Sequence, residues 1–379
     1  MKHLFSYAML PIALITFLVT PIASFPANDF NDWVHSIRSV DREGEGNLQA
    51  SEAWNNLTQL GGDRIPELLQ AMDGAGKLSL NWFRSAIETI VDREKRQGVN
   101  FPLAALGEFL MDTRQNPRAR RFAFEMIKES DPKAAAVLIP GMLNDPSVEL
   151  RRSSVQLLIN KGVSFLKSNE NNAAILVFRQ ALGAARDVDQ TRQLSDHLKD
   201  LKQKVDLPRH FGFLMDWKII GPFDNTDYKG FSEVYAPERM IDLSASYPGK
   251  NKEATWKDFR SEDEFGMIDI NKVCGLLKET TAYAYTEFYS EKGGPVELRL
   301  GSKNGWKVWL NGEFLFGRDE YHRNMKIDQY QLPGQLNPGK NTILVKACQN
   351  EQIETWTVEW QFQLRVCDSS GTAILSTDR

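Results

Sequence analysis

The sequence predicts a two-part protein in which an array of α-helices is followed by an antiparallel β-sandwich. Apolar residues recur at helical spacing from about residue 47 to residue 205, and that range shows no strand-like alternation. From residue 212 onward, short segments alternate between apolar and polar residues and are separated by turn-forming residues. We therefore predict a helical domain over residues 29–205 and a β domain over residues 206–379, since a chain of 379 residues usually holds more than one domain.

The first residues have the composition of an export signal. Lys2 and His3 precede an apolar run from Leu4 to Ala23, and the chain becomes polar at Asn28. We assign residues 1–24 to a signal peptide, although neighbouring small residues offer other cleavage positions. The alternative is an uncleaved leader, because a run of this length can span a bilayer. The mature protein is expected to be exported to the periplasm or outside the cell, with a membrane contact only through an uncleaved leader.

Charge and cysteine content exclude two further classes. The net charge is -4 and both signs are spread along the chain, so there is no basic patch of the kind that binds nucleic acid. Cys274, Cys348 and Cys367 are too few for a disulfide framework. We expect all three to be free, buried thiols.

The helical part contains a repeated pattern. Asn116-Pro117 is followed by Arg120 and an apolar stripe, and Asp145-Pro146 is followed by Arg151 and another stripe. Further stripes at 65–72, 80–90, 101–110 and 137–143 predict additional helices. The pattern resembles HEAT repeats, and the last helices, 173–201, resemble a tetratricopeptide (TPR) pair that caps the array. The resemblance implies a HEAT/TPR-like α-solenoid, whose concave face is a possible site for a protein partner.

The β domain is predicted from strands with alternating faces. A short apolar strand covers 217–223, and a strand over 281–289 places Ala282, Ala284 and Phe288 on one face. Val296, Leu298 and Leu300 mark the dry face of the next strand.

Two turns and a last strand complete the expected β domain. Asn311-Gly312 favours a type I′ hairpin turn because both residues tolerate positive φ. It follows a strand in which Trp306, Val308 and Leu310 point inward and Trp309 points outward. A second turn is expected at 338–341 and a last strand at 356–364, and this succession of short strands is typical of a β-sandwich.

The strand over 296–300, the segment 308–312 and Leu336 with Gly339, Asn341, Ile343 and Val345 resemble the galactose-binding-like jelly roll. That family includes the N-terminal sugar-binding domain of β-galactosidase-type enzymes. Together with the leader and the HEAT-like helices, the chain resembles exported planctomycete-type proteins of unknown function. The resemblance implies an antiparallel jelly-roll sandwich for 206–379 that either binds sugar or has a purely structural role.

The loop over residues 317–324 is the richest candidate for a sugar site. It offers an aromatic ring for stacking, two acids and two bases, and further aromatic residues lie on a strand leading toward it and in a later segment. The alternatives are that the outward tryptophan packs on the sheet face, and that an acid and a base of the loop, Asp319 and Arg323, pair with each other. The candidate ligand-binding residues are Trp309, Asp319, Glu320, Tyr321, His322, Arg323 and Trp356.

No pattern for a metal or for catalysis stands out. The segment 224–227 has oxygen ligands like part of a calcium loop, but it lacks the glycine and the final glutamate, so an Asx turn explains it better. The chain has no nucleophile elbow, zinc-binding helix or phosphate-binding loop, and no identifiable carboxylate pair. We expect that the protein binds no cofactor and is not an enzyme.

Two functions remain. The first is a non-catalytic exported binding protein whose β-sandwich binds a carbohydrate or a glycan-bearing envelope component. The alternative is a protein-protein interaction scaffold that acts through its HEAT-like helices, with a purely structural sandwich. The two differ in whether Trp309, Tyr321 and Trp356 share one exposed patch. An unrecognised hydrolase is a third reading, which requires a deep pocket with perturbed carboxylates.

Overall fold

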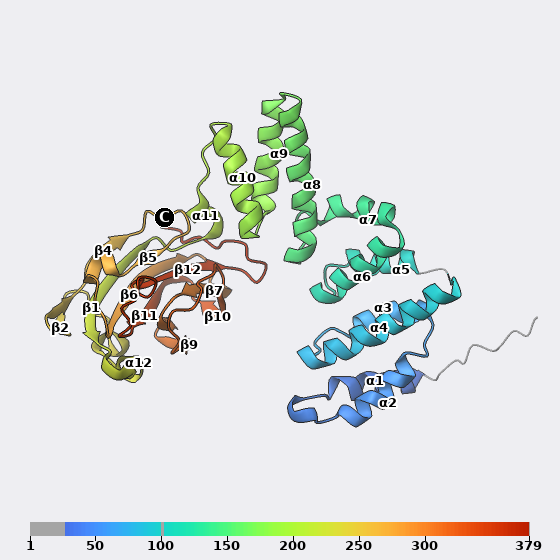
Figure 1. Ribbon diagram of the computed structural model, residues 1–379, viewed down its shortest axis with the longest axis horizontal. Helices are drawn as coiled ribbons and strands as arrows, with labels where there is room; N and C mark the ends of the chain where they lie inside the picture. Colours follow the sequence, from blue (N-terminus) through green and yellow to red (C-terminus); the bar gives the residue numbers. More distant parts are fainter. Residues whose placement is uncertain (1–26, 100–101, 379) are drawn as a thin grey trace, which may run out of the picture. The chain divides into compact units, whose positions relative to one another are not determined.

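A computed structural model describes residues 27–99 and 102–378, in which a helical region is followed by antiparallel sheets (Figure 1). The leader predicted over residues 1–24 lies outside the described residues. The chain divides into two compact units, Met1–Met126 and Ile127–Arg379, called here unit 1 and unit 2. No helix among the described residues is both long enough and apolar enough to cross a membrane.

Unit 1 consists of helices whose apolar stripes face one another. Phe83, Ala86, Ile87 and Ile90 are fully buried, as their helical spacing predicts. The helices are α1 (Ala27–Arg38), α2 (Asn47–Leu57), α3 (Ile65–Gln70), α4 (Lys77–Gln97), α5 (Leu103–Met111) and α6 (Pro117–Ser130), whose last residues belong to unit 2.

The repeated Asx-Pro and Arg residues have parallel roles in the two units. Asn116 accepts hydrogen bonds from backbone N–H groups in the first turn of α6 and so caps it. The buried guanidinium of Arg120 donates from Nε to the carbonyl of Leu110 at 2.7 Å. In unit 2, Arg151 donates from Nε to the carbonyl of Asp145, also at 2.7 Å. Each arginine thus donates to a carbonyl in the segment before its own helix. This bond fixes how the helix packs against that segment.

Five helices of unit 2 precede its sheets. They are α7 (Pro132–Leu138), α8 (Val148–Lys167), α9 (Asn171–Ala184), α10 (Val188–Asp200) and α11 (Leu207–Phe211). Helices α8 and α9 approach closely at Gly162, where an added Cβ would lie 2.3 Å from the ring of Phe178. The small residue lets the ring pack against the backbone.

Two antiparallel sheets and a short ribbon follow. The six-stranded sheet has the order β4-β1-β6-β11-β8-β9, and the four-stranded sheet has the order β10-β7-β12-β5. The strands of the first are β1 (Asp216–Asp224), β4 (Lys257–Arg260), β6 (Thr280–Ser290), β8 (Gly305–Leu310), β9 (Glu313–Arg318) and β11 (Gly339–Gln349). Those of the second are β5 (Ile268–Asp269), β7 (Gly294–Ser302), β10 (Tyr330–Leu336) and β12 (Gln361–Cys367), and β2 (Ser246–Pro248) pairs with β3 (Glu253–Thr255).

The inward faces of both sheets share one core, and the predicted alternation is confirmed. The core takes Ala282, Ala284 and Phe288 from β6, Val296, Leu298 and Leu300 from β7, and Trp306, Val308 and Leu310 from β8. Asn311 and Gly312 have φ of 54° and 80°, as the type I′ turn requires. The three cysteines are free and buried.

The last strand begins later than predicted. Strand β12 starts at Gln361, and residues 356–360 form part of a loop. The hydroxyl oxygen of Thr357 lies 2.9 Å from the carbonyl oxygens of both Gln352 and Glu354, and its one hydrogen is shared between them. These contacts hold the segment in a turn. Trp356 is therefore a loop residue.

The outer face of the six-stranded sheet is covered by the segment with α12 (Lys229–Ser232) and α13 (Ala236–Arg239). Lys346 of β11 is fully buried beneath it and donates from Nζ to the carbonyls of Phe231 and Glu233 at 3.2 and 2.6 Å. Its Nζ also lies 2.7 Å from the carboxylate of Glu238, which accepts a hydrogen bond from the hydroxyl of Tyr283. Burial lowers the pKa of Lys346, and these oxygens offset that cost.

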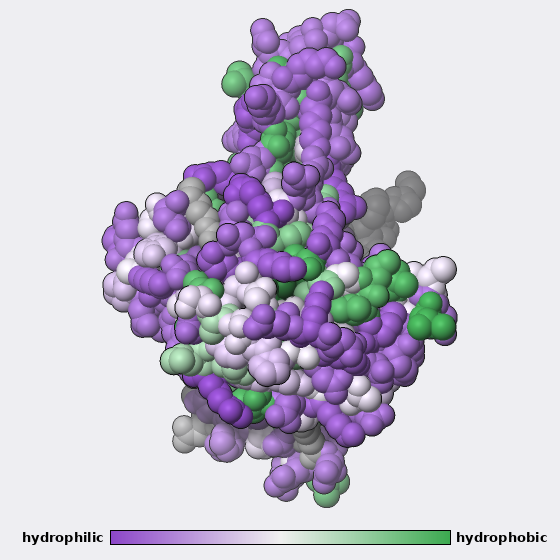
Figure 2. Space-filling model, turned by 90° about the vertical axis from the view of Figure 1, so that its left-hand side faces the viewer, coloured by the Kyte–Doolittle hydropathy of each residue, from purple (hydrophilic) through white to green (hydrophobic). Residues whose placement is uncertain are grey.

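The face of the protein seen in Figure 2 is mostly hydrophilic. Figure 2 shows hydrophobic residues gathered into small, separate patches between hydrophilic ones. Patches of this kind are ordinary for a folded protein.

Replacing the buried cation should be strongly destabilising. In Lys346→Met the carboxylate of Glu238 loses its counter-ion, and we expect the free energy of unfolding to fall by about 3–5 kcal/mol. Denaturant unfolding measures the change, and the double variant Lys346→Met/Glu238→Gln should recover part of it. A loss below about 1 kcal/mol in the single variant would contradict the assigned role.

His210 should make stability depend on pH. Its side chain is partly buried beside Arg186, and this burial followed by that positive charge lowers the pKa of His210 from about 6.5 to about 4. The unfolded chain therefore binds the proton more tightly, and stability falls as pH drops from about 6.5 toward 4, by about 3 kcal/mol for this group. His210→Gln keeps a donor for the Ala185 carbonyl, so its unfolding free energy should fall less over that range. Identical pH profiles of the two proteins would refute this.

Candidate functional site

Three loops at one end of the six-stranded sheet form a depression of about 450 Å³. Neighbouring strands alternate in direction along the order β1-β6-β11-β8-β9, so β1, β11 and β9 run the same way and their following loops meet at one end. The depression is lined by Tyr228, Asp319, Glu320, Tyr321, His322, Arg323, Asn350, Gln352 and Trp356. The structure thus brings six of the seven sequence-predicted residues together and leaves Trp309 outside. We call this the Tyr321 depression.

Tyr321 forms the inner wall of the depression. Its hydroxyl accepts a hydrogen bond from Nδ2 of Asn225 at 3.2 Å, and its ring meets that of Tyr228 edge-on, with centroids 5.2 Å apart. Burial raises the pKa of Tyr321 above its ordinary value, so the hydroxyl keeps its proton. A Cβ at Gly305 would lie 3.1 Å from this hydroxyl, so the close approach depends on glycine.

A buried amide network holds the loops in place. Asn225 is 1% exposed, and its Nδ2 also donates to the carbonyl of Gln349 at 3.0 Å. The side chain of Gln349 accepts from Asn304 at 2.9 Å and donates to the carbonyl of Thr357 at 3.1 Å. Because these bonds form where water is excluded, they fix the loop that carries Trp356 relative to Tyr321.

His322 and Trp356 form the outer wall. Nε2 of His322 lies 2.7 Å from Oδ1 of Asn350, and because an amide oxygen only accepts, this nitrogen carries the proton. The imidazole meets the indole of Trp356 edge-on, with centroids 5.5 Å apart and planes at 85°. Trp356 is 60% exposed, so much of its ring is open to a ligand.

Charged groups line the rim. Arg323 pairs with Glu320 at 3.4 Å, rather than with Asp319 as one alternative from the sequence supposes. Burial raises the pKa of Asp319. The carboxylates and the guanidinium can accept from and donate to the hydroxyl groups of a polar ligand.

Trp309 lies on the covered face of the sheet. It is 8% exposed and packs among Ile220, Tyr285 and Leu344 in a second apolar cluster. The alternation places Trp309 outward, but the segment held by Lys346 lies over that face. The patch of Trp309, Tyr321 and Trp356 is therefore not formed, whereas Tyr321 and Trp356 do share a site.

The segment 224–227 is stabilised by protein groups. One oxygen of Asp224 accepts from the hydroxyl of Thr226 at 2.7 Å and from its backbone N–H at 3.3 Å, and it lies 3.1 Å from Nζ of Lys250. This is the expected Asx turn. Over residues 27–99 and 102–378, no three His, Cys, Asp or Glu side chains are placed to hold a metal ion.

Tyr228, Asn225, Asn350 and Gln352 belong to the site or support it but are not among the sequence-predicted residues. Tyr228 has φ of 63° and follows Asp227 with φ of 53°, a pair of left-handed conformations that non-glycine residues seldom adopt. Neither alternation nor turn composition indicates such a conformation. The run of polar residues after Phe223 indicates a loop, but it does not indicate that this loop contacts the loop over residues 317–324.

Comparison with known proteins does not assign the chain to a family. No protein-family model and no curated protein matches it. A β-glucosidase from Kluyveromyces marxianus in complex with glucose aligns with a TM-score of 0.26 and 11% identity, over 41% of this chain and 16% of that one. Its selenomethionine-labelled form gives 0.25 and 9%, over 45% and 21%. The GH31 α-xylosidase from Xanthomonas citri gives 0.20 and 12%, over 30% and 15%. The chain spans a small part of each, and likeness at this level carries no argument about function.

Removing the amide of Asn225 should weaken this end of the protein. Asn225→Ala deprives Tyr321 and the carbonyl of Gln349 of their donor, and we expect a loss of about 1–3 kcal/mol in the free energy of unfolding. Denaturant unfolding checks the value. Asn324→Ala, at an exposed position of the neighbouring loop, is the matched control and should change it by less than about 0.5 kcal/mol. Equal losses in the two variants would refute the assigned role.

Proposed function

We propose that this protein is a non-catalytic, exported binding protein that holds a carbohydrate in the Tyr321 depression. The sheets of unit 2 are, in this proposal, a galactose-binding-like jelly roll, and the preceding helices are a HEAT-like solenoid. The export step rests on the leader at residues 1–24, and the ligand is a glycan or a glycan-bearing component of the envelope.

The observation that carries the proposal is the meeting of aromatic rings and polar groups in one depression. Trp356 and Tyr228 are exposed aromatic rings, and the apolar C–H face of a sugar ring packs on such surfaces. Asp319, Glu320 and Gln352 are within the same lining and suit the hydroxyl groups of a sugar. A few polar groups placed around an apolar surface are the usual composition of a small-molecule site.

The same residues favour binding over hydrolysis. Glycoside hydrolysis needs two carboxylates that face each other across the bond to be cut, one of them protonated. Here Asp319 and Glu320 are consecutive on one loop, and Glu320 is paired with Arg323. This arrangement supports ligand orientation without bond cleavage.

A second candidate is a scaffold that holds a protein partner along the helices. Large apolar side chains are exposed on the helices of unit 2, with Val137 at 79% and Leu176 at 71%. The burial of Trp309 also agrees with this alternative, which expects aromatic residues packed on the sheet. We rank carbohydrate binding first because Tyr321 and Trp356 share one depression.

A glycan array probed with the purified full-length protein tests the proposal. We expect specific binding to one class of glycan and a three- to tenfold weaker affinity for Trp356→Ala, since an aromatic contact contributes about 0.5–1.5 kcal/mol. Affinities are measured by titration calorimetry with the glycan that the array identifies.

Phe314→Ala is the matched control, because Phe314 is also an exposed aromatic residue and lies on β9 outside the depression. It should bind the glycan as tightly as the unchanged protein. Absence of binding to every glycan by the folded protein would sink the proposal. Binding that survives Trp356→Ala but not Phe314→Ala would place the site elsewhere.

A further inference from the structure

A second pocket, of about 500 Å³, lies at the opposite end of the six-stranded sheet. Its lining includes Asp216, at the start of β1, and Phe288, near the end of β6. The Tyr321 depression, by contrast, lies beyond the end of β1. Helix α11 and the last described residues, 374–378, complete the wall of the pocket. Ala373 pairs with Cys367, and the backbone N–H of Thr377 donates to the carbonyl of Tyr289 at 3.0 Å, so this segment is fixed.

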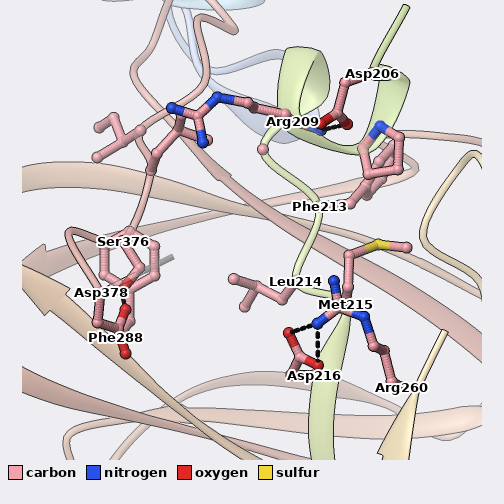
Figure 3. A pocket seen from close by; sticks show the side chains of 14 residues that line it. Asp206, Arg209, Phe213, Leu214, Met215, Asp216, Arg260, Phe288, Ser376 and Asp378 are labelled. Atoms are coloured by element: carbon pink, nitrogen blue, oxygen red, sulfur yellow. Dashed lines mark hydrogen bonds and ion pairs between the residues drawn. The ribbon is translucent and has the colours of Figure 1, made fainter.

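The floor of this pocket is apolar. Leu214 and Phe288 point toward one another below its mouth (Figure 3), and both belong to the core that the two sheets share. Phe213 and Met215 add apolar surface on one side, and Ile374 adds more from the C-terminal segment. An open space of this size lined by such side chains suits the apolar part of a small molecule.

The charged groups at the mouth are committed to the protein, with one exception. Asp216 accepts two hydrogen bonds from Arg260, at 2.6 and 2.7 Å, and Asp206 caps α11 by accepting from the backbone N–H of Arg209 at 2.9 Å. Asp378 accepts from the hydroxyl of Ser376. The exposed guanidinium of Arg209 extends along the upper edge of the pocket, away from Asp206 (Figure 3).

Within the described residues, the guanidinium of Arg209 has neither an ion pair nor a hydrogen bond. A guanidinium is always charged and presents several donors in a plane that matches a carboxylate. The pocket thus combines an apolar floor with one uncommitted positive charge at its mouth. A neutral apolar molecule would leave that charge unused, whereas an anionic head group can pair with it.

We propose that this pocket binds a small amphipathic anion, with its apolar body against Met215 and Ile374 above the floor of Leu214 and Phe288, and its carboxylate on Arg209. The site is separate from the Tyr321 depression, and the proposal does not depend on carbohydrate binding. A medium-chain carboxylate such as octanoate has the required chemistry, because its chain is apolar and its head group bears a single negative charge.

The test uses the full-length protein and the fluorescent probe 8-anilinonaphthalene-1-sulfonate, which is itself an apolar body with one negative charge. We expect saturable binding at one site, displacement by octanoate, and at least tenfold weaker displacement by octanol or octyltrimethylammonium. Arg209→Ala should weaken binding of the probe and of octanoate about tenfold, since a hydrogen bond to a charged group contributes about 1.5 kcal/mol or more. Arg209→Lys keeps the charge and should retain most of the affinity.

Arg118→Ala, an exposed arginine of α6, is the matched control and should bind like the unchanged protein. A diazirine-bearing octanoate should cross-link to peptides that contain residues 206–216 or 374–378. The proposal is overturned by absence of binding, by equal displacement with octanol, by unchanged affinity in Arg209→Ala, or by cross-links confined to other peptides.

Discussion

The burial of the Lys346 ammonium group is the constraint on which the rest of the sheet domain depends. A buried ion pair adds little net stability, because desolvation offsets its attraction, but it tolerates only an arrangement in which every donor is satisfied. Lys346 meets that condition by binding two carbonyls of the covering segment and the carboxylate of Glu238. The segment is therefore fixed over the outer face of the sheet. With both faces of the sheet covered, the ends of the strands are where a ligand finds open, shaped surface.

Most of the fold of the sheet domain could be predicted from local patterns. Alternation assigns Ala282 and Tyr283 to opposite faces, and Asn311-Gly312 specifies the hairpin, because these features depend only on neighbouring residues. The covering of the outer face could not be predicted this way, although a sign of it is present. The outward set contains Tyr283, Tyr285 and Trp309, which a face open to water rarely carries together.

The site could be predicted only in part for a related reason. The loop over residues 317–324 is rich enough in binding chemistry to be recognised by itself, and Trp356 could be suspected from its type. Their meeting with Tyr228 and Asn225 depends on the order of the strands, in which β1, β11 and β9 share one direction. That order is set by contacts between distant segments, and a single sequence does not display it. Trp356 lies in a turn rather than in a strand because the hydroxyl of Thr357 bonds to carbonyls within the loop. The local sequence is compatible with either structure.

The loops of the Tyr321 depression are held in their positions before any ligand arrives. His322 has φ of 56° and Tyr228 has φ of 63°, and such conformations cost a non-glycine residue about 1–2 kcal/mol each. They persist because the surrounding contacts impose them: Asn350 holds the imidazole of His322, and Glu351 accepts the hydroxyl hydrogen of Tyr228. Folding thus bears the cost of ordering these rings, so that a ligand does not. Rigid aromatic walls of this kind favour affinity by reducing the entropy lost on binding, even in a depression as open as this one.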